Sequence, residues 1–320
     1  MNIFFTSLSS STESPGLEGN FRTAFFNIYQ SFGSAPKTAA INKHVRRANP
    51  DFMAFSECSV ADFSYIQTEY AADGYTHFLD GGQSTQILAM SKYPIIFSDI
   101  VAVAGAFNAI YCEIEVNNRL VGIMSIHTAP DCVTPPCRTS ESDPINEPRG
   151  WNRTIQMYSY IEYFNNRYAA NSDIDGFIIQ GDFNEDNRWN SPSEYTVQQP
   201  GGITKPSWLN YPIPREVFPN TFFEHFNVPT NEIPAFKVAP ARDLANDINT
   251  IWTFIPNINL TLPAVLDYSC STFPIVASEL INSEVDSNDS GIEKVGEPLD
   301  FPDSRTASDH LMIVADILIQ

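Results

Sequence analysis

The chain has 320 residues, of which 43% are hydrophobic, and a formal charge of −20 from 38 Asp and Glu against 18 Lys and Arg. A chain of this length can bury a large core, and α/β proteins of this size are often one domain. The negative charge disfavours electrostatic tracking along nucleic acid unless positive charge is concentrated locally, and no apolar run approaches the roughly 18 residues of a membrane-spanning helix.

The first residues, MNIFFTSLSSS, have no basic n-region and too short an apolar stretch for a signal peptide. The compartment is therefore left open between secreted and cytoplasmic. We expect residues 1–20 to be an N-terminal extension, residues 21–320 to form a single domain, and the protein to be a monomer.

Apolar runs bounded by turn residues predict strands, which in chain order cover residues 22–28, 51–57, 76–80, 85–91, 109–116, 120–127, 176–182, 264–271 and 311–318. Helical spacing of apolar residues predicts helices over residues 36–48, 59–72 and 157–168. The first of these has Pro36 in its first turn and ends at Asn49-Pro50.

Strands dominate, and helices recur without strict βα alternation. This pattern favours an α/β fold with two packed mixed or antiparallel sheets flanked by helices, rather than a barrel or a doubly wound sheet. Residues 187–249 are rich in Pro, Asn and aromatic residues, which is typical of long loops. Their aromatic side chains would either stack nucleic-acid bases or bind a lipid, or pack a small core under the loops, and we favour the small core.

Positive charge is concentrated in one segment. Residues 21–50 contain five basic residues and no acid, namely Arg22, Lys37, Lys43, Arg46 and Arg47. A helix with a solvated basic face is the favoured interpretation, and a phosphate-binding ridge is the alternative.

The five cysteines do not form a zinc-binding pattern. Cys112 and Cys270 lie in apolar, strand-like sequence and are expected to be buried thiols. Cys132 and Cys137 bracket a proline turn, and a small disulfide loop and a pair of free thiols are equally compatible with their spacing.

Polar residues that can bind a metal or move a proton recur where the predicted strands end. They are Asn27, Glu57, His127, Asp182, Asn184, Asp267, Asp309 and His310. Each has an ordinary explanation, because strand ends are solvated and Asp and Asn favour turns. Their recurrence indicates a shared site, since carboxylates and amides suit a hard cation such as Mg²⁺ and a carboxylate-bound histidine stabilises a phosphoryl group. Together they favour metal-assisted hydrolysis of a phosphoester.

The sequence resembles the endonuclease/exonuclease/phosphatase superfamily, the metal-dependent phosphoesterases that include deoxyribonuclease I. The resemblance runs from about Phe21 to Ile319 and consists of motifs in the family's order: NIYQ, FSE, MSKYPI, SIHTAP, QGDFNED, LDYS and SDHLMIV. It implies a four-layer α/β sandwich with the site at one rim.

The resemblance also implies a role for each strand-end residue. Asn27, Glu57 and Asp309 would bind Mg²⁺, or Mn²⁺ or Ca²⁺ in its place. Asp182 and Asn184 would contact the scissile phosphate and position the attacking water. Asp267 would orient His310, which would stabilise the phosphate or act as acid or base, and His127 matches the family's second histidine. Arg153 resembles the arginine that contacts the substrate phosphate, although a surface charge at a helix start is nearly as good an interpretation.

Two departures from the family's motifs bear on which branch of the family the chain resembles and on which histidine acts as the acid. FSECS and IHTAP do not match the apurinic-site endonucleases, so that branch is disfavoured. The acid that would pair with His127 should lie near GGQSTQILAM, which offers only neutral groups such as Ser84, Thr85 and Gln86. A neutral partner stabilises a histidinium less well, so His310 is the more secure acid.

The sequence also contains a weak match to a calcium-binding loop, formed by Asp286, Asn288, Ser290 and Glu297. No helix is predicted after it, which favours a solvated acidic loop instead.

Three functions are compatible with the sequence. The preferred one is a metal-dependent phosphodiesterase acting on DNA. The second is a phosphatase or a lipid phosphodiesterase of phosphoinositide or sphingomyelin type, which the negative charge favours. The third is a catalytically silent binding module, which would have no physical need to keep carboxylates that repel one another without a cation.

Overall fold

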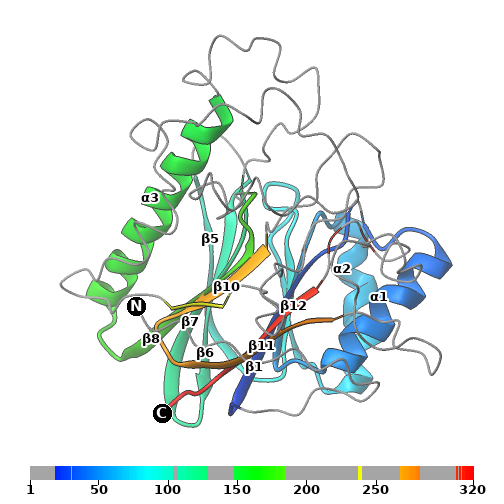
Figure 1. Cartoon of the computed structure of the whole chain (residues 1–320), viewed down its shortest axis with the longest axis horizontal. Coiled ribbons are helices and arrows are strands. Elements are labelled where there is room, and N and C mark those ends of the chain that lie inside the picture. The colour runs from blue at the N-terminus through cyan, green and yellow to red at the C-terminus, as the bar shows by residue number, and fades with distance from the viewer. Residues whose placement is uncertain are drawn as a thin grey trace, which may run out of the picture.

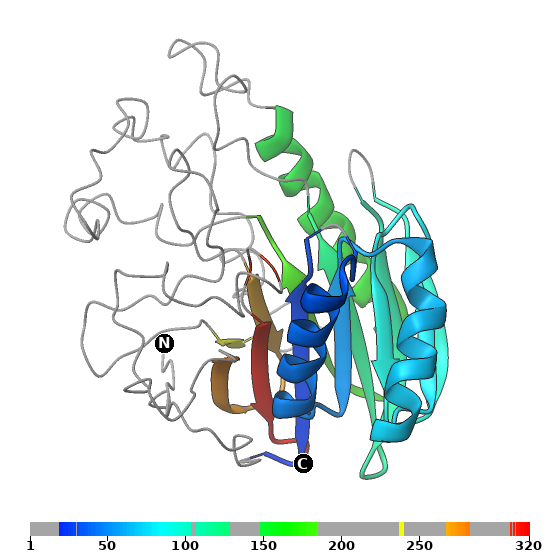
Figure 2. The ribbon, with the colours of Figure 1, turned by 90° about the vertical axis from the view of Figure 1, so that its right-hand side faces the viewer.

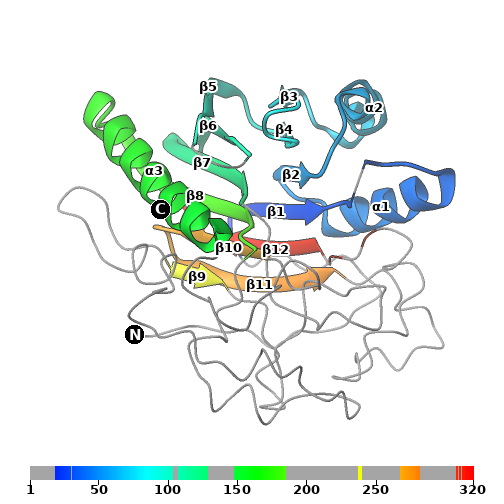
Figure 3. The same cartoon turned by 90° about the horizontal axis from the view of Figure 1, so that it is seen from above.

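The computed structural model describes residues 19–29, 31–103, 107–128, 148–184, 237–239, 267–281, 308, 310 and 312–320. These residues form two six-stranded sheets that pack face to face. Helices α1 (Ala35–Ala48) and α2 (Val60–Tyr70) cover the outer face of one sheet, and α3 (Pro148–Ala170) covers the outer face of the other (Figures 1 and 3). The predicted four-layer α/β sandwich is confirmed.

The first sheet has the strand order β11-β12-β1-β2-β4-β3. Its strands are β1 (Phe21–Asn27), β2 (Phe52–Ser56), β3 (His77–Asp80), β4 (Leu88–Ser91), β11 (Ile275–Ile281) and β12 (Met312–Ile317). β1 and β2 are parallel and are joined by α1, whereas the other neighbours are antiparallel. Figure 2 shows α1 and α2 side by side over this sheet, and a short 3-10 helix, η1 (Ala71–Asp73), follows α2.

The second sheet has the order β5-β6-β7-β8-β10-β9. Its strands are β5 (Ile95–Val101), β6 (Ala109–Val116), β7 (Arg119–His127), β8 (Ile174–Asp182), β9 (Lys237–Ala239) and β10 (Asp267–Ser271). β7 and β8 are parallel, with α3 between them in the chain, and the remaining neighbours are antiparallel. The two parallel pairs matter for the site, because residues that end parallel neighbours lie at the same edge of a sheet.

The core has three apolar layers. Phe25, Phe52, Ile123 and Ile178 belong to the layer between the sheets. Successive side chains of a strand point to opposite faces, so Phe26 and Phe55 pack under α1 and α2 instead, and Phe177 and Ile179 pack under α3. The central strands are buried on both faces, and for this reason their sequences are nearly continuous apolar runs.

The ends of α1 and α2 follow from local sequence. Pro36 lies at the start of α1, and Asn49, with φ of 46°, ends it in the left-handed conformation. At the start of α2, the Asp62 carboxylate accepts the Ser59 backbone N–H at 2.7 Å.

Three strands, β5, β9 and β11, are absent from the sequence-based prediction. All three lie at sheet edges. An edge strand is covered on fewer sides, and most of β5 is partly or fully exposed, so its apolar periodicity is weak. α3 also begins at Pro148, nine residues before the predicted start at 157.

The basic segment contains buried as well as exposed cations. Arg22 lies in β1, not on a helix, and its guanidinium donates to both carboxylate oxygens of Asp316 at 2.6 and 2.8 Å. Arg46 on α1 pairs with Glu69 and Asp73. These two arginines therefore neutralise acids of the same chain.

Cys112 and Cys270 are buried free thiols, as predicted. Cys132 and Cys137 lie outside the described residues, as do the calcium-loop residues Asp286, Asn288, Ser290 and Glu297 and all of 187–249 except β9. No helix in the described part of the chain is long and apolar enough to cross a membrane.

Candidate active site

The candidate site lies where the two sheets meet at one rim. The register of the second sheet places His127 opposite Asp182, and Asp182 opposite Asp267, so neighbouring strands contribute one row of polar side chains. Asn27, the last residue of β1, reaches this row from the first sheet, and its side-chain Nδ2 donates to Asp182 Oδ2 at 3.0 Å.

A second polar row lies directly beneath the first. It contains Ser125, Gln180 and Ser269, each two residues further into its strand. Gln180 joins the sheets, since its Oε1 accepts the Thr23 hydroxyl at 2.5 Å and its Nε2 donates to the Ala24 carbonyl at 3.1 Å. The space between the sheets thus changes from apolar at its centre to polar at the rim.

The chain after β8 is fixed by its own side chains. Asp182 Oδ1 accepts the Asn184 N–H at 2.8 Å, and Asn184 has φ of 47°. Asn184 Nδ2 donates to the Thr128 carbonyl at 3.1 Å, which ties the ends of β7 and β8 together. Gly181 permits this approach, because a Cβ there would lie 2.2 Å from the Ile126 carbonyl oxygen.

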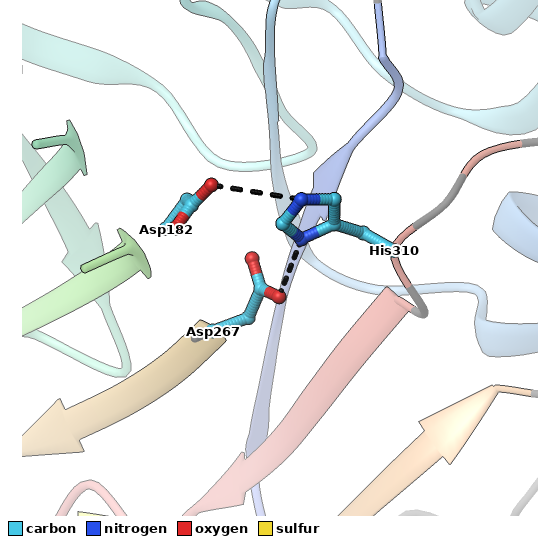
Figure 4. A group of neighbouring side chains, drawn as sticks. All are labelled: Asp182, Asp267 and His310. Carbon is cyan, nitrogen blue, oxygen red and sulfur yellow. Dashed lines mark hydrogen bonds and ion pairs between the residues drawn. The ribbon is translucent and has the colours of Figure 1, made fainter. Parts of the chain in front are cut away.

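Asp267 and His310 form a hydrogen-bonded pair. His310 Nδ1 lies 2.8 Å from Asp267 Oδ2, and its Nε2 lies 3.8 Å from Asp182 Oδ2 (Figure 4). Ser308 holds the segment against β1: its hydroxyl donates to the Asn27 carbonyl at 2.6 Å and accepts the His310 N–H at 3.1 Å. The carboxylate–histidine arrangement fixes which ring nitrogen faces the site.

Glu57 and His127 complete the described site. Glu57 follows β2 with φ of 59°, and its Oε1 accepts a second hydrogen bond from Asn27 Nδ2 at 3.0 Å. His127 Nε2 lies 4.0 Å from Glu57 Oε1 and 3.8 Å from Asp182 Oδ2. The structure therefore brings together Asn27, Glu57, His127, Asp182, Asn184, Asp267 and His310.

Burial sets the protonation of this cluster. It raises the pKa of Asp182 to about 7, with the nearby Asp267 carboxylate adding to the shift and His310 and Asn27 opposing it. Burial lowers the pKa of His127 to about 4, although Glu57 opposes that shift. Concentrated negative charge with little access to water is the environment in which a cation is favoured.

The donor set fits a hard divalent cation. Glu57 and Asp182 converge on the Asn27 amide, and carboxylate and amide oxygens are ligands that Mg²⁺ and Ca²⁺ accept. Asn27 would become a ligand after its amide rotates, because its Oδ1 here accepts the Tyr29 N–H at 3.0 Å. One ligand atom each from Asp182, Asp267 and His310 also lie within 4.8 Å of one another, although Asp267 already engages His310 Nδ1.

Two predicted site residues lie beyond this description. Asp309 is outside the described residues, and Arg153 lies in α3 without a described side chain. Sequence reasoning missed Gln180, Ser308 and Thr128, which support the site. All three lie within motifs quoted above, namely QGDFNED, SDHLMIV and SIHTAP, so their motif positions were the available signal.

The fold is shared with several solved structures, whereas comparisons of the sequence alone find no relative. No protein-family model matches the sequence, and no curated protein is similar to it in sequence. D. rerio TDP2 complexed with a single-strand DNA product is 13% identical, with 92% of this chain and 97% of that chain covered and a TM-score of 0.53. Beta toxin of Staphylococcus aureus is 16% identical, with 92% and 99% covered and a TM-score of 0.52.

An endonuclease/exonuclease/phosphatase family protein of Leptotrichia buccalis is 12% identical, with 93% of this chain and 100% of that chain covered and a TM-score of 0.51. The chain therefore has the deoxyribonuclease-I-like fold of the endonuclease/exonuclease/phosphatase superfamily, as the motifs predicted. At 12–16% identity the likeness is one of fold.

Proposed function

We propose that this protein is a metal-dependent phosphodiesterase that uses water to hydrolyse phosphodiester bonds in nucleic acid. The observation that carries the proposal is the convergence on Asp182, whose Oδ2 accepts the Asn27 amide at 3.0 Å and lies 3.8 Å from the Nε2 atoms of both His127 and His310. Such an array of carboxylate, amide and imidazole groups suits phosphoester hydrolysis.

Asn27 and Glu57, with Asp309, would hold the cation, for which Mg²⁺ is the first candidate and Mn²⁺ or Ca²⁺ are alternatives. A bound divalent cation would supply charge neutralisation at the phosphate. Asp182, whose Oδ2 accepts the Asn27 amide and faces the Nε2 atoms of both histidines, would accept a proton from the attacking water, and Asn184 would orient that water.

The histidines would act on the phosphate oxygens. Asp267 holds His310 Nδ1, so Nε2 faces the reacting group, where it would stabilise negative charge and supply the proton that the leaving oxygen takes up. His127 would donate a hydrogen bond from Nε2 to a second oxygen. As water adds to phosphorus, the bond from phosphorus to the leaving oxygen breaks. Arg153 is proposed as a further phosphate contact.

Nucleic acid is the proposed substrate because the HTAP motif resembles the deoxyribonuclease branch and a protein of this fold has been crystallised with a DNA product. The second candidate keeps the chemistry but acts on a lipid phosphodiester or a phosphomonoester. It is favoured by the charge of −20 and by the pairing of Arg22 and Arg46 with acids of the same chain, which removes them as duplex contacts.

The test is a substrate panel with a matched pair of variants. Plasmid DNA, single-stranded DNA, RNA, a phosphoinositide, sphingomyelin and a phosphomonoester are each incubated with Mg²⁺, Mn²⁺, Ca²⁺ or chelator. Asp182→Asn should reduce metal-dependent cleavage by about a thousandfold, because it removes the proposed base without changing size. The control is Asp175→Asn on the same strand, whose carboxylate pairs with Arg119 away from the site.

Cleavage of DNA by the wild type, lost in Asp182→Asn and kept in Asp175→Asn, supports the proposal. Cleavage of sphingomyelin or the phosphoinositide alone would transfer it to the lipid alternative. Full activity of Asp182→Asn would refute the proposed chemistry.

A further inference from the structure

Phe107 packs its ring flat against His127. The two ring centroids are 4.7 Å apart, and the planes are inclined by only 9°. Phe107 comes from the connection between β5 and β6, whereas His127 ends β7, so the contact joins two separate elements at the rim. Near-parallel stacking fixes the plane of a ring more closely than ordinary apolar contact does.

Asn108, the residue that follows Phe107, is held by two hydrogen bonds. The Asn108 N–H donates to the Ser84 carbonyl at 2.9 Å, and the Asn108 side-chain Oδ1 accepts the Val103 N–H at 3.2 Å. Ser84 lies in the turn between β3 and β4 of the other sheet. This turn therefore anchors Asn108, the residue next to Phe107.

The Nδ1 atom of His127 has an unusual environment. Its Nδ1 is buried and makes no hydrogen bond with any residue that the structure describes. In a functional histidine, a hydrogen bond on the nitrogen away from the reacting group normally sets the ring orientation. Here the stack on the face of Phe107 is the described contact that could set the orientation of the His127 ring.

The direction in which His127 points is nevertheless well defined. Its Nε2 lies 4.0 Å from Glu57 Oε1 and 3.8 Å from Asp182 Oδ2. Two carboxylates on that side favour the tautomer with the proton on Nε2, which leaves Nδ1 with a lone pair and no donor to satisfy. A ring held in this way presents an N–H toward the place where a phosphate oxygen would bind.

We propose that Phe107 is a positioning residue, which holds the His127 ring by stacking and so performs the task that a hydrogen bond to Nδ1 performs in other histidine sites. The inference rests on the proposed function, in which His127 contacts the substrate phosphate. It adds a specific expectation: the aromatic ring at position 107 matters for catalysis although it touches neither substrate nor cation.

A double-mutant cycle tests this proposal on the full-length protein. Phe107→Leu should lower kcat by about tenfold to a hundredfold, the cost typical of removing a supporting residue. Phe107→Tyr keeps the stacking face and should retain most of the activity. In an His127→Ala background, Phe107→Leu should cost nothing further, because the two residues act as one unit.

A matched control separates positioning from general packing. Phe97→Leu removes a phenyl ring from the same hairpin, where that ring stacks against the Arg167 guanidinium at 3.9 Å. This variant should keep its kcat, and thermal unfolding of each variant shows whether it is folded. Equal kcat for Phe107→Leu and wild type, or losses in Phe107→Leu and His127→Ala that multiply, would overturn the proposal.

An NMR measurement on the metal-free protein makes the outcome independent of the proposed function. Ring current from Phe107 should shift the His127 carbon-bound protons upfield, and Phe107→Leu should remove that shift while Phe107→Tyr keeps it. If the shift is present but no phosphoester is hydrolysed, the proposed function fails while the stacking stands. If Phe107→Leu leaves the His127 resonances unchanged, the positioning role is refuted even in an active enzyme.

Discussion

The side-chain amide of Asn27, at the end of β1, donates hydrogen bonds to Asp182 of the opposite sheet and to Glu57 beside it, both at 3.0 Å. One NH₂ group therefore separates two carboxylates that would otherwise face each other. This is the same space in which a divalent cation would be favoured, so the amide and the cation act on the same repulsion.

The first prediction replaces this amide by a carboxylate. Asn27→Asp should lower the thermal unfolding temperature in chelator, because a third carboxylate joins Glu57 and Asp182 and no donor remains between them. Saturating Mg²⁺ should raise the unfolding temperature of this variant more than that of the wild type. Differential scanning fluorimetry with and without Mg²⁺ measures both effects.

Asn42→Asp is the matched control for this substitution. Asn42 donates to Glu69 at 3.0 Å on the helical side of the same sheet, so the change also sets two carboxylates together. It should destabilise the protein without any added response to Mg²⁺. An equal Mg²⁺ response in both variants would count against cation binding at Asn27.

The second prediction concerns Asp267. Its carboxylate lies 2.8 Å from His310 Nδ1, and Asp267→Asn should lower kcat by about a hundredfold because the ring loses its fixed tautomer and orientation. KM should change little, since the substitution acts through His310. Asp99→Asn is the control. Asp99 lies on the exposed edge strand β5, away from the site, and its carboxylate likewise accepts one side-chain hydrogen bond, from the Tyr163 hydroxyl. Unchanged kcat in Asp267→Asn would show that the pair is structural.

The sequence predicted the central strands and most of the described site for one physical reason. Strands buried on both faces read as apolar runs, and a polar residue that ends such a run marks the rim, as His127 and Asp182 do. Edge strands such as β5 lack this contrast. Phe107 was not predicted because an aromatic residue in a loop carries no sign of its partner, and the stack on His127 exists only after β5, β6 and β7 are paired.

The third prediction concerns the polar row beneath the site. Gln180→Met should reduce the free energy of unfolding by about 1–3 kcal/mol, because the Thr23 hydroxyl and the Ala24 carbonyl lose their buried partner. Adding Thr23→Val should recover part of the loss by removing the orphaned hydroxyl. Urea unfolding of the two single variants and the double variant measures this coupling, and simple additivity would mean that Gln180 does not bridge the sheets.

The fourth prediction is a pH dependence of stability in the metal-free protein. The pKa of Asp182 is raised from an ordinary value near 3.8 to about 7, mainly by burial. When folding raises the pKa of a carboxyl group, its contribution to stability is complete at pH values below the pKa of the unfolded state. The contribution is lost as pH rises to and through the pKa of the folded state. Between pH 4 and 7 the unfolding free energy should therefore fall by up to about 1.4 kcal/mol for each pH unit from this group.

His127 has the opposite effect over part of the same range. Its pKa is lowered from an ordinary value near 6.5 to about 4, so its contribution is lost as pH falls, and it offsets the slope from Asp182 below about pH 6.5.

The difference in unfolding free energy between wild type and Asp182→Asn isolates the effect of the Asp182 carboxylate. In chelator the wild type should lose stability relative to Asp182→Asn as pH rises from 5 to 8. Saturating Mg²⁺ should reduce the trend, because the cation stabilises the ionised carboxylate. A difference that stays constant with pH would show that Asp182 is already ionised in the metal-free site.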